Sequence, residues 1–329
     1  MIRWLVLAAV SAAIARPPSE FGNWVVGCDN GLSCRAVGFQ VEGEEVFYSL
    51  SVFRSGQPDA APKITLDVEG VVAAVGDGKR VPLHFGAGDE VAAADVPALL
   101  RLLLAARKLE FVNKAGRVVA RISPAGSSAA LRWMDEHQNR VGSVTALVAT
   151  GARPASALPA PPRLSKVVTA APSSKPAKTL GAAAIAEIQR KYDCSPSESS
   201  EPEFRRLDAG HSLALVPCNM GAYQGSSIAL LVDDDGKWSA PRFVGAYRDP
   251  DDAPPDLFKA EELTEPEFDP KTLELWTAYK GRGLNDCGGM EGYAWDGQRF
   301  RLVYQNLMSS CSGSRERITI WRTENHPQD

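Results

Sequence analysis

The first half of the chain alternates short apolar runs with turn-forming residues. The runs are rich in β-branched and aromatic residues and lie at 24–26, 46–53, 63–68 and 71–75. Turn-forming pairs and triplets lie between them, at 29–31, 69–70 and 77–78. Runs of this length bounded by Asp, Asn and Gly are typical of β-strands joined by tight turns. The pattern therefore predicts a mostly β N-terminal half.

Two segments of this half have helical spacing instead. The Asp-Val-Pro sequence at 95–97 provides an N-cap and a proline in the first turn, and predicts a helix to about Arg107. A second helix is predicted to begin at Ser127 or Ser128. Its spacing places three residues on roughly one face, namely Leu131, Met134 and His137.

The second half begins with a helical stripe and ends with a strand pattern. A helix is predicted near 180–192, with Ile185, Ile188 and Tyr192 along one side. The alternation of polar and apolar residues at 315–322 predicts a final strand.

Two Asp-Gly pairs in this half predict β-hairpins. Asp235-Gly236 lies between apolar runs at 228–232 and 238–244, and Asp296-Gly297 lies between runs at 293–295 and 300–304. An Asp-Gly pair between strands favours a type I′ turn, in which both central residues have positive φ.

Residues 151–178 separate the two halves. They contain six prolines, five basic residues and no acidic or aromatic residue, so little of this segment can be buried. We expect an N-terminal domain at 16–150, a basic linker at 151–178 and a C-terminal domain at 179–329. The predicted class is α+β and β-rich, with two antiparallel β domains, each with one or two helices, joined by a disordered linker.

The first 15 residues have the pattern of a secretory signal peptide. Arg3 precedes an apolar run from Trp4 to Ile14, and Ala13 and Ala15 form a small-x-small cleavage site. The run is too short to span a bilayer. We therefore expect a periplasmic or secreted protein with no integral membrane anchor after cleavage.

Charge is distributed unevenly along the chain. The net charge is −4, but residues 179–329 contain 16 basic and 25 acidic residues. An acidic half argues against nucleic acid as a partner, because phosphate binding needs basic surface. The acids concentrate in 249–269, which predicts a solvated acidic loop or, alternatively, a docking site for a cationic partner.

Six cysteines form an even set, consisting of Cys28, Cys34, Cys194, Cys218, Cys287 and Cys311. Export would place them in an oxidising compartment, where thiols pair. If the two domains fold independently, Cys28 must pair with Cys34, and the other four cysteines retain three possible pairings. Sequential pairing would close two loops of equal span. A metal site is disfavoured because there is no C-x-x-C and no histidine at ligand spacing from a cysteine.

Motifs of known catalytic or cofactor sites are absent from the sequence. It contains no Gly-x-Ser-x-Gly, P-loop, Gly-x-Gly-x-x-Gly or His-Glu-x-x-His pattern. The acidic clusters at 233–235 and 249–252 lack the alternate acids and distal glutamate of a calcium loop. We therefore expect no cofactor and no metal ion.

One segment is a candidate binding site. Residues 281–289 contain four glycines, and Arg282 and Asp286 lie close to Cys287, which is expected to be disulfide-bonded. Nearby aromatic residues could line a shallow binding surface with them, namely Trp276, Tyr279, Tyr293 and Trp295. The alternative is a tight loop in which Arg282 pairs with Asp286 and the aromatic residues lie in the core.

Several motifs resemble those of an exported proteobacterial family, the domain of unknown function 1176. The opening Phe-Gly-Asn-Trp-Val-Val-Gly-Cys at 21–28 resembles this family, as do the stretches at 122–135, 144–148, 279–288 and 294–300. The N-terminal half also resembles, more loosely, the invasion-associated locus B proteins, which are linked to host-cell invasion. The resemblance implies location and architecture, and it defines no catalytic residue.

Three hypotheses for function follow. The leading one is a non-enzymatic binding protein with a partner in the envelope or the host. The second is an inhibitor of an external hydrolase such as lysozyme, because an acidic loop could meet a basic enzyme. The third is an envelope glycan hydrolase, which requires two carboxylates about 5–10 Å apart in a cleft. Sequence alone does not specify the oligomeric state.

Overall fold

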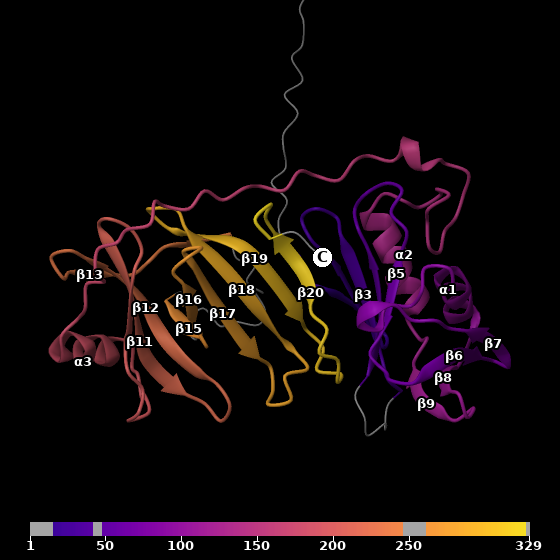
Figure 1. Ribbon diagram of the computed structural model, residues 1–329, viewed down its shortest axis with the longest axis horizontal. Helices are drawn as coiled ribbons and strands as arrows, with labels where there is room; N and C mark the ends of the chain where they lie inside the picture. The colour runs from indigo at the N-terminus through magenta and orange to yellow at the C-terminus, as the bar shows by residue number, and fades with distance from the viewer. Residues whose placement is uncertain (1–15, 42–47, 246–260, 327–329) are drawn as a thin grey trace, which may run out of the picture.

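Antiparallel sheets make up most of the structure (Figure 1). The computed structural model describes residues 16–41, 48–245 and 261–326. Three α-helices and four sheets lie within these ranges, which confirms the α+β, β-rich class. The predicted signal peptide at 1–15 and much of the acidic stretch, up to residue 260, lie outside the described residues. None of the described helices is long and apolar enough to cross a membrane.

The N-terminal half contains two sheets. The first is a five-stranded meander of β1 (Ser19–Phe21), β2 (Trp24–Cys28), β3 (Cys34–Phe39), β4 (Ser49–Arg54) and β5 (Lys63–Leu66). The second has the order β7-β6-β8-β9 and consists of β6 (Val71–Gly76), β7 (Lys79–Pro82), β8 (Leu109–Asn113) and β9 (Val118–Ile122). The helical elements are η1 (Ala87–Asp89), α1 (Val96–Ala105) and α2 (Ser127–His137). Both helices predicted in this half are thus confirmed.

The C-terminal half begins with α3 (Ala182–Lys191) and continues as two further sheets. The first consists of β10 (Glu203–Arg206), β11 (His211–Met220), β12 (Gly225–Asp233) and β13 (Trp238–Ser239), with β15 (Glu262–Thr264) also paired to β12. The second has the order β14-β19-β18-β17-β16, with β20 also paired to β19. Its strands are β14 (Phe243–Val244), β16 (Glu267–Asp269), β17 (Glu274–Lys280), β18 (Gly288–Trp295), β19 (Phe300–Met308) and β20 (Ile318–Arg322).

Alternation along β11 shows how these layers pack. Leu213 and Leu215 lie in the apolar cluster shared with the second sheet, whereas Ala214 and Val216 lie in the cluster beneath α3. Because successive side chains of a strand point to opposite faces, an uninterrupted apolar run indicates a strand covered on both sides. The helix and the second sheet provide the two covers.

Both predicted hairpins are present, but their turns are not type I′. Gly236 and Gly297 have φ values of 84° and 95°, whereas neither aspartate has a positive φ. The Asp296 carboxylate instead accepts hydrogen bonds from the amides of Gln298 and Arg299, at 2.9 Å each. This Asx-type geometry needs no positive φ at the aspartate.

The two halves share a buried interface. The outer face of β2 and β3 contributes Val25 and Val37, and β20 contributes Ile318 and Ile320, all at most 1% exposed. Gly27 lies so close to β20 that a Cβ atom there would be 2.8 Å from Ile318 Cγ2. The outer face of β2–β3 is thus closed by a strand from the other end of the chain.

Polar contacts fix the position of β20 at this interface. Arg322 pairs with Asp29, whose side chain is fully buried. The Arg322 amide donates to Asn30 Oδ1 at 2.9 Å, and Asn30 Nδ2 donates to the Arg322 carbonyl at 3.0 Å. Burial raises the pKa of Asp29, and the guanidinium of Arg322 opposes that shift. The halves therefore meet with a defined register.

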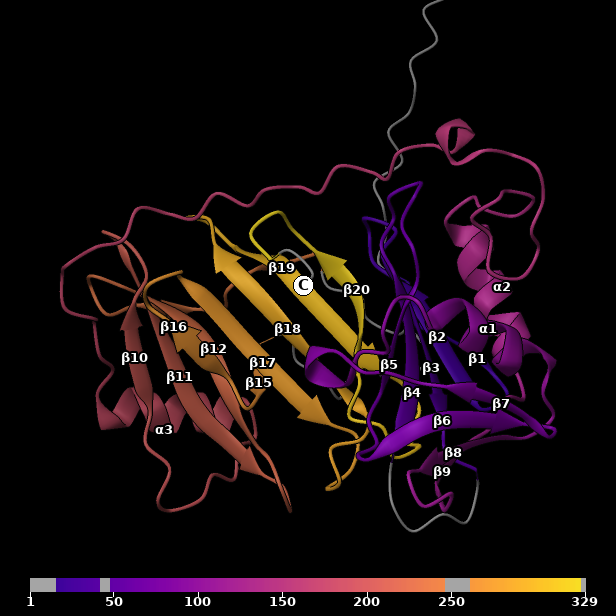
Figure 2. The same ribbon diagram turned by 45° about the vertical axis from the view of Figure 1, so that its right-hand side comes forward.

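The linker is extended and lies along one edge of both halves (Figures 1 and 2). Its one short helical element is η2 (Ala155–Ala157). Leu158 and Val167 are buried, and the Ala170 amide donates to the Trp295 carbonyl at 2.8 Å. The Ser165 carbonyl accepts from the Glu324 amide at 3.0 Å. The composition predicted a disordered linker with little buried surface. The structure instead buries two of its side chains and hydrogen-bonds its backbone to the folded part of the chain.

We expect trypsin to cleave the linker without separating the halves. Arg163, Lys166 and Lys178 are exposed and lie outside any helix or strand, which favours proteolysis. The interface between β2–β3 and β20 should then hold the fragments together. Digestion under native conditions should give one size-exclusion peak that contains two fragments. Two separate peaks would contradict the interface, and an uncut linker would contradict the division into two domains.

Candidate functional site

Arg282 and Asp286 form an ion pair in the loop between β17 and β18. Arg282 Nε donates to Asp286 Oδ1 at 2.7 Å, and Arg282 Nη2 donates to the Cys311 carbonyl at 2.8 Å. The Gly313 amide donates to Asp286 Oδ2 at 2.8 Å. The guanidinium of Arg282 lowers the pKa of Asp286 and outweighs the opposing effect of burial. The pair therefore ties this loop to the segment that follows β19.

Tyr293 and Trp295 lie in the core rather than on the surface. Their exposed fractions are 2% and 0%. Trp295 Nε1 donates to Asp208 Oδ2 at 2.7 Å, which satisfies the indole inside the protein. The two residues are two positions apart on β18 and share its inner face. The expectation that they line an exposed binding surface is therefore wrong.

Other apolar residues are exposed around Arg282. Half of the eight exposed large apolar residues in the described ranges lie in or beside the β11–β12 turn and the β17–β18 loop, and we call these four residues the tip surface. They are Met220, Tyr223, Tyr279 and Leu284. The loops adjoin, because the Lys280 amide donates to Gln224 Oε1 at 2.9 Å. A Cβ atom at Gly283 would lie 3.5 Å from the ring of Tyr223. The ends of β12 and β17 that carry these loops lie at the same lower edge in Figures 1 and 2.

Positive charge accompanies the tip surface. Arg282 and Arg317 both interact with Asp286, which is 2% exposed. Arg317 Nη2 also donates to the carbonyl and the side-chain oxygen of Asn285, at 3.0 and 3.1 Å. Burial lowers the pKa of Arg317, and Asp286 counteracts that effect. One carboxylate thus faces two guanidinium groups, which leaves an excess of positive charge.

The structure pairs all six cysteines, as Cys28–Cys34, Cys194–Cys218 and Cys287–Cys311. Of the three pairings that the sequence left open in the C-terminal half, the sequential one is formed. Asp286, Cys287 and Cys311 have ligand atoms within 4.8 Å of one another. A metal would need free thiolates, and this disulfide consumes both. The Cys287–Cys311 disulfide therefore fixes the end of the loop between β17 and β18 covalently.

An acidic groove adjoins the β11–β12 hairpin and includes Met220 in its lining. Its volume is about 500 Å³, and its wall includes the Cys194–Cys218 disulfide through Cys218. Four glutamates and no basic residue line it, namely Glu201, Glu203, Glu265 and Glu267. Three of the four are exposed and Glu203 is partly exposed. Exposed carboxylates differ from the general acid of a glycoside hydrolase, which lies in apolar surroundings.

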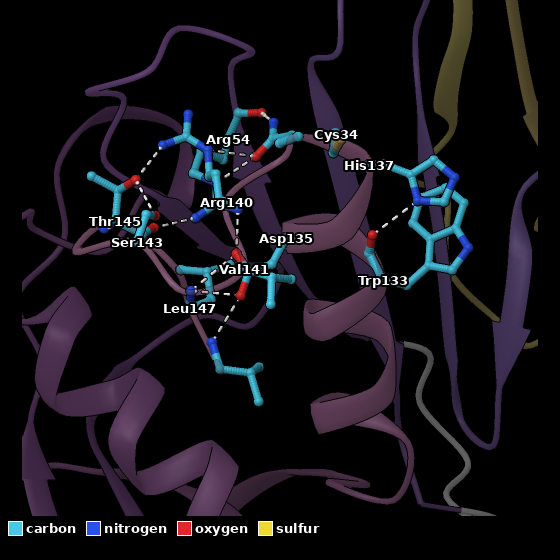
Figure 3. A network of polar contacts seen from close by, with 12 residues as sticks. Cys34, Arg54, Trp133, Asp135, His137, Arg140, Val141, Ser143, Thr145 and Leu147 are labelled. Carbon is cyan, nitrogen blue, oxygen red and sulfur yellow. Dashed lines mark hydrogen bonds and ion pairs between the residues drawn. The ribbon is translucent and has the colours of Figure 1, made fainter. Parts of the chain in front are cut away.

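A buried polar network lies in the N-terminal half (Figure 3). Arg54 on β4 donates from Nη2 to Asp135 Oδ1 on α2 at 2.7 Å, and from Nε to Gln138 Oε1 at 2.7 Å. Arg140 Nε donates to the same Gln138 oxygen at 3.1 Å. Gln138 Nε2 donates to the Leu32 carbonyl at 2.7 Å, which connects the network to the Cys28–Cys34 loop. The network joins α2, β4 and this loop.

Charge in this network is unbalanced. Arg54, Asp135 and Arg140 are at most 1% exposed, so two guanidinium groups share one buried carboxylate. Burial lowers the pKa of Arg140 to about 10, and the charge of Arg54 adds to that effect. Asp135 also accepts the amides of Leu147 and Val148, at 2.8 and 2.9 Å. The closed setting indicates that this network holds the structure together and does not contact a ligand.

Comparison with known proteins identifies the family. The model of a protein family of unknown function, DUF1176, matches residues 18–324. The chain belongs to this family. It is also similar to the uncharacterized protein YpfG of Escherichia coli (strain K12), with 28% identity over 350 residues and 98% of each chain covered. No solved structure matches the chain.

The sequence pattern of this DUF1176 member did not reveal the buried network. The buried side of α2 consists of Ser127, Ala130, Leu131, Met134 and Asp135, followed by Gln138 just beyond the helix. His137, predicted to share that face, is only half-buried and stacks on Trp133 with ring centroids 3.5 Å apart. The spacing could have shown that Asp135 and Gln138 lie on the buried face of α2, because they follow Leu131 by four and seven residues.

We expect Asp135→Asn to destabilise the protein by about 3–5 kcal/mol, because it removes the buried negative charge that Arg54 and Arg140 share. Glu136→Gln is the matched control, since Glu136 is half-exposed and forms an i,i+4 pair with Arg132. Loss of this exposed ion pair should lower the free energy of unfolding by less than about 0.5 kcal/mol. Urea unfolding of both variants measures the difference. Equal urea midpoints for the two variants would show that the buried Asp135 contributes no more stability than the exposed Glu136.

Proposed function

We propose that this protein is an exported, non-enzymatic binding protein of the cell envelope, and that it binds through the tip surface. The observation that carries the proposal is the concentration of exposed Tyr, Leu and Met side chains in and beside two adjoining loops. Contiguous apolar patches are uncommon on monomeric proteins unless they bind something. Tyrosine and arginine are also the residues most enriched where binding energy is concentrated.

Two further features support the proposal. Three disulfides suit an oxidising compartment such as the periplasm or the exterior. The Cys287–Cys311 disulfide and the Arg282–Asp286 pair restrain the loop that carries Leu284. A restrained loop loses less conformational entropy when it binds, so more of the contact energy appears as affinity.

The binding proposal predicts that the mature chain co-sediments with isolated cell envelopes. Tyr223→Ser combined with Leu284→Ser should lower the bound fraction about tenfold, because each change removes an exposed apolar contact. The matched control is Val144→Ser combined with Val168→Ser, since these valines are 60% and 74% exposed away from the tip surface. Binding that is equal in all three proteins would reject the tip surface as the site.

A second candidate function is supported by the acidic groove, which could receive a basic side chain of an external hydrolase such as lysozyme. The groove lining holds four glutamates and no basic residue, which provides charge complementarity to a cationic enzyme, although Glu203 also pairs with Arg205. The exposed residues Glu201 and Glu267 lie at this groove and can be neutralised without removing a buried contact.

We expect the mature chain to inhibit lysozyme at micromolar concentration if this second function is correct. Glu201→Gln with Glu267→Gln should then weaken inhibition about tenfold. Glu69→Gln with Glu187→Gln, which neutralises two exposed glutamates elsewhere, should leave it unchanged. Activity unaffected by a micromolar excess of the unmodified chain would eliminate this function.

A further inference from the structure

We propose that the tip surface binds the surface of an anionic phospholipid bilayer. This inference rests on the proposed envelope-binding function and specifies its partner. It is carried by three properties of the tip surface, which are the kinds of side chain it exposes, the charge around them and the rigidity of the loops that hold them.

The exposed side chains are of the kinds that enter a membrane interface. Leu284 and Met220 are 53% and 58% exposed, and Tyr223 and Tyr279 are 44% and 43% exposed. Tyrosine prefers the level of the lipid headgroups, where its ring is buried and its hydroxyl is hydrated. These residues lie at or next to the ends of two chain reversals, so they can reach the headgroup region together without unfolding a strand.

Charge around the tip surface is opposite in sign to that of the rest of this half. Residues 179–329 contain 16 basic and 25 acidic residues, but the segments 279–289 and 309–317 contain four basic and two acidic ones. Both acids are paired, Asp286 with Arg282 and Glu316 with Arg35. Residues 219–225 of the other loop contain no charged residue. Basic side chains near a bilayer are attracted to anionic headgroups, at a strength that falls with salt.

Rigidity keeps the apolar side chains at the surface. The loop from 281 to 287 is closed by the Gly281 amide, which donates to the Cys287 carbonyl at 2.9 Å. A disulfide joins Cys287 to Cys311, and Arg317 donates to the Asn285 carbonyl. Leu284 lies between these fixed points and is held outward before any partner arrives. Such preorganisation lowers the entropic cost of binding.

The acidic groove limits the orientation of the bilayer. It begins at Met220 and contains Glu265, which accepts the Gly225 amide. Four glutamates would be repelled by anionic headgroups. The contact should therefore centre on Leu284 and Tyr223 and leave the groove in solvent.

Vesicle binding tests the proposal directly. The full mature chain is sedimented with vesicles of phosphatidylethanolamine and phosphatidylglycerol, and separately with vesicles of phosphatidylcholine alone. We expect binding to the anionic vesicles, at least about tenfold weaker binding to the neutral ones, and a loss of binding at 0.5 M salt. Equal binding to both vesicle types, or none to either, would overturn the proposal.

Matched variants locate the contact. Tyr223→Ser with Leu284→Ser should reduce binding to anionic vesicles about tenfold. Arg315→Ser, at an exposed basic residue of the same region, should reduce it severalfold. Val144→Ser with Val168→Ser should change nothing. Binding indifferent to the tip variants would show that another surface contacts the lipid.

Comparison with the envelope assay separates the two proposals. Binding to envelopes that depends on Tyr223 and Leu284, without binding to purified lipid, would overturn the lipid inference and retain the binding function with a protein or glycan partner. If the chain binds neither envelopes nor purified lipid, both proposals are overturned.

Discussion

Burial of the outer face of β2 and β3 by β20 is the contact on which the arrangement of the two halves depends. The run Trp24-Val25-Val26 has apolar residues on both faces, and only one face can be covered by the N-terminal core. Water contact on the other face would forgo the free energy gained by burying several branched side chains. The last strand of the chain covers that face, and its Arg322 in turn compensates the buried charge of Asp29.

Among the described residues, two arginines surround a buried aspartate at two places. Arg54 and Arg140 surround Asp135 in the N-terminal core, and Arg282 and Arg317 surround Asp286 beside a disulfide. In both places the guanidinium groups also donate to backbone carbonyls of irregular segments. A planar group with several donors can satisfy carbonyls that no strand or helix partners. Arginine therefore orders the loops, and the aspartate limits the cost of placing these cations in poorly hydrated surroundings.

Local patterns in the sequence were sufficient for the helices, the hairpin positions and the class of fold. The helical stripes and the Asp-Gly pairs are short-range signals, and helices and hairpins lie where they predict, although the turns are not type I′. The chemistry of the candidate site was harder to predict, because it depends on contacts between distant segments. For Tyr293 and Trp295 the sequence left a surface and a core position open, since nothing local reveals that a second sheet covers them. Leu284 and Tyr223 became a joint surface only when the hairpin after β11 was placed against the loop after β17.

The late position of β20 also affects the order of assembly. Asn30 and Asp29 meet Arg322 across separations of 292 and 293 residues, among the most distant contacts that this chain can form. Closing so long a loop is entropically costly and slow. A chain synthesised or exported from its N-terminus must therefore keep Val25 and Val37 uncovered until nearly all of its residues are available. During that interval β2 and β3 present an apolar face to other unfolded chains, so aggregation competes with the final step of folding.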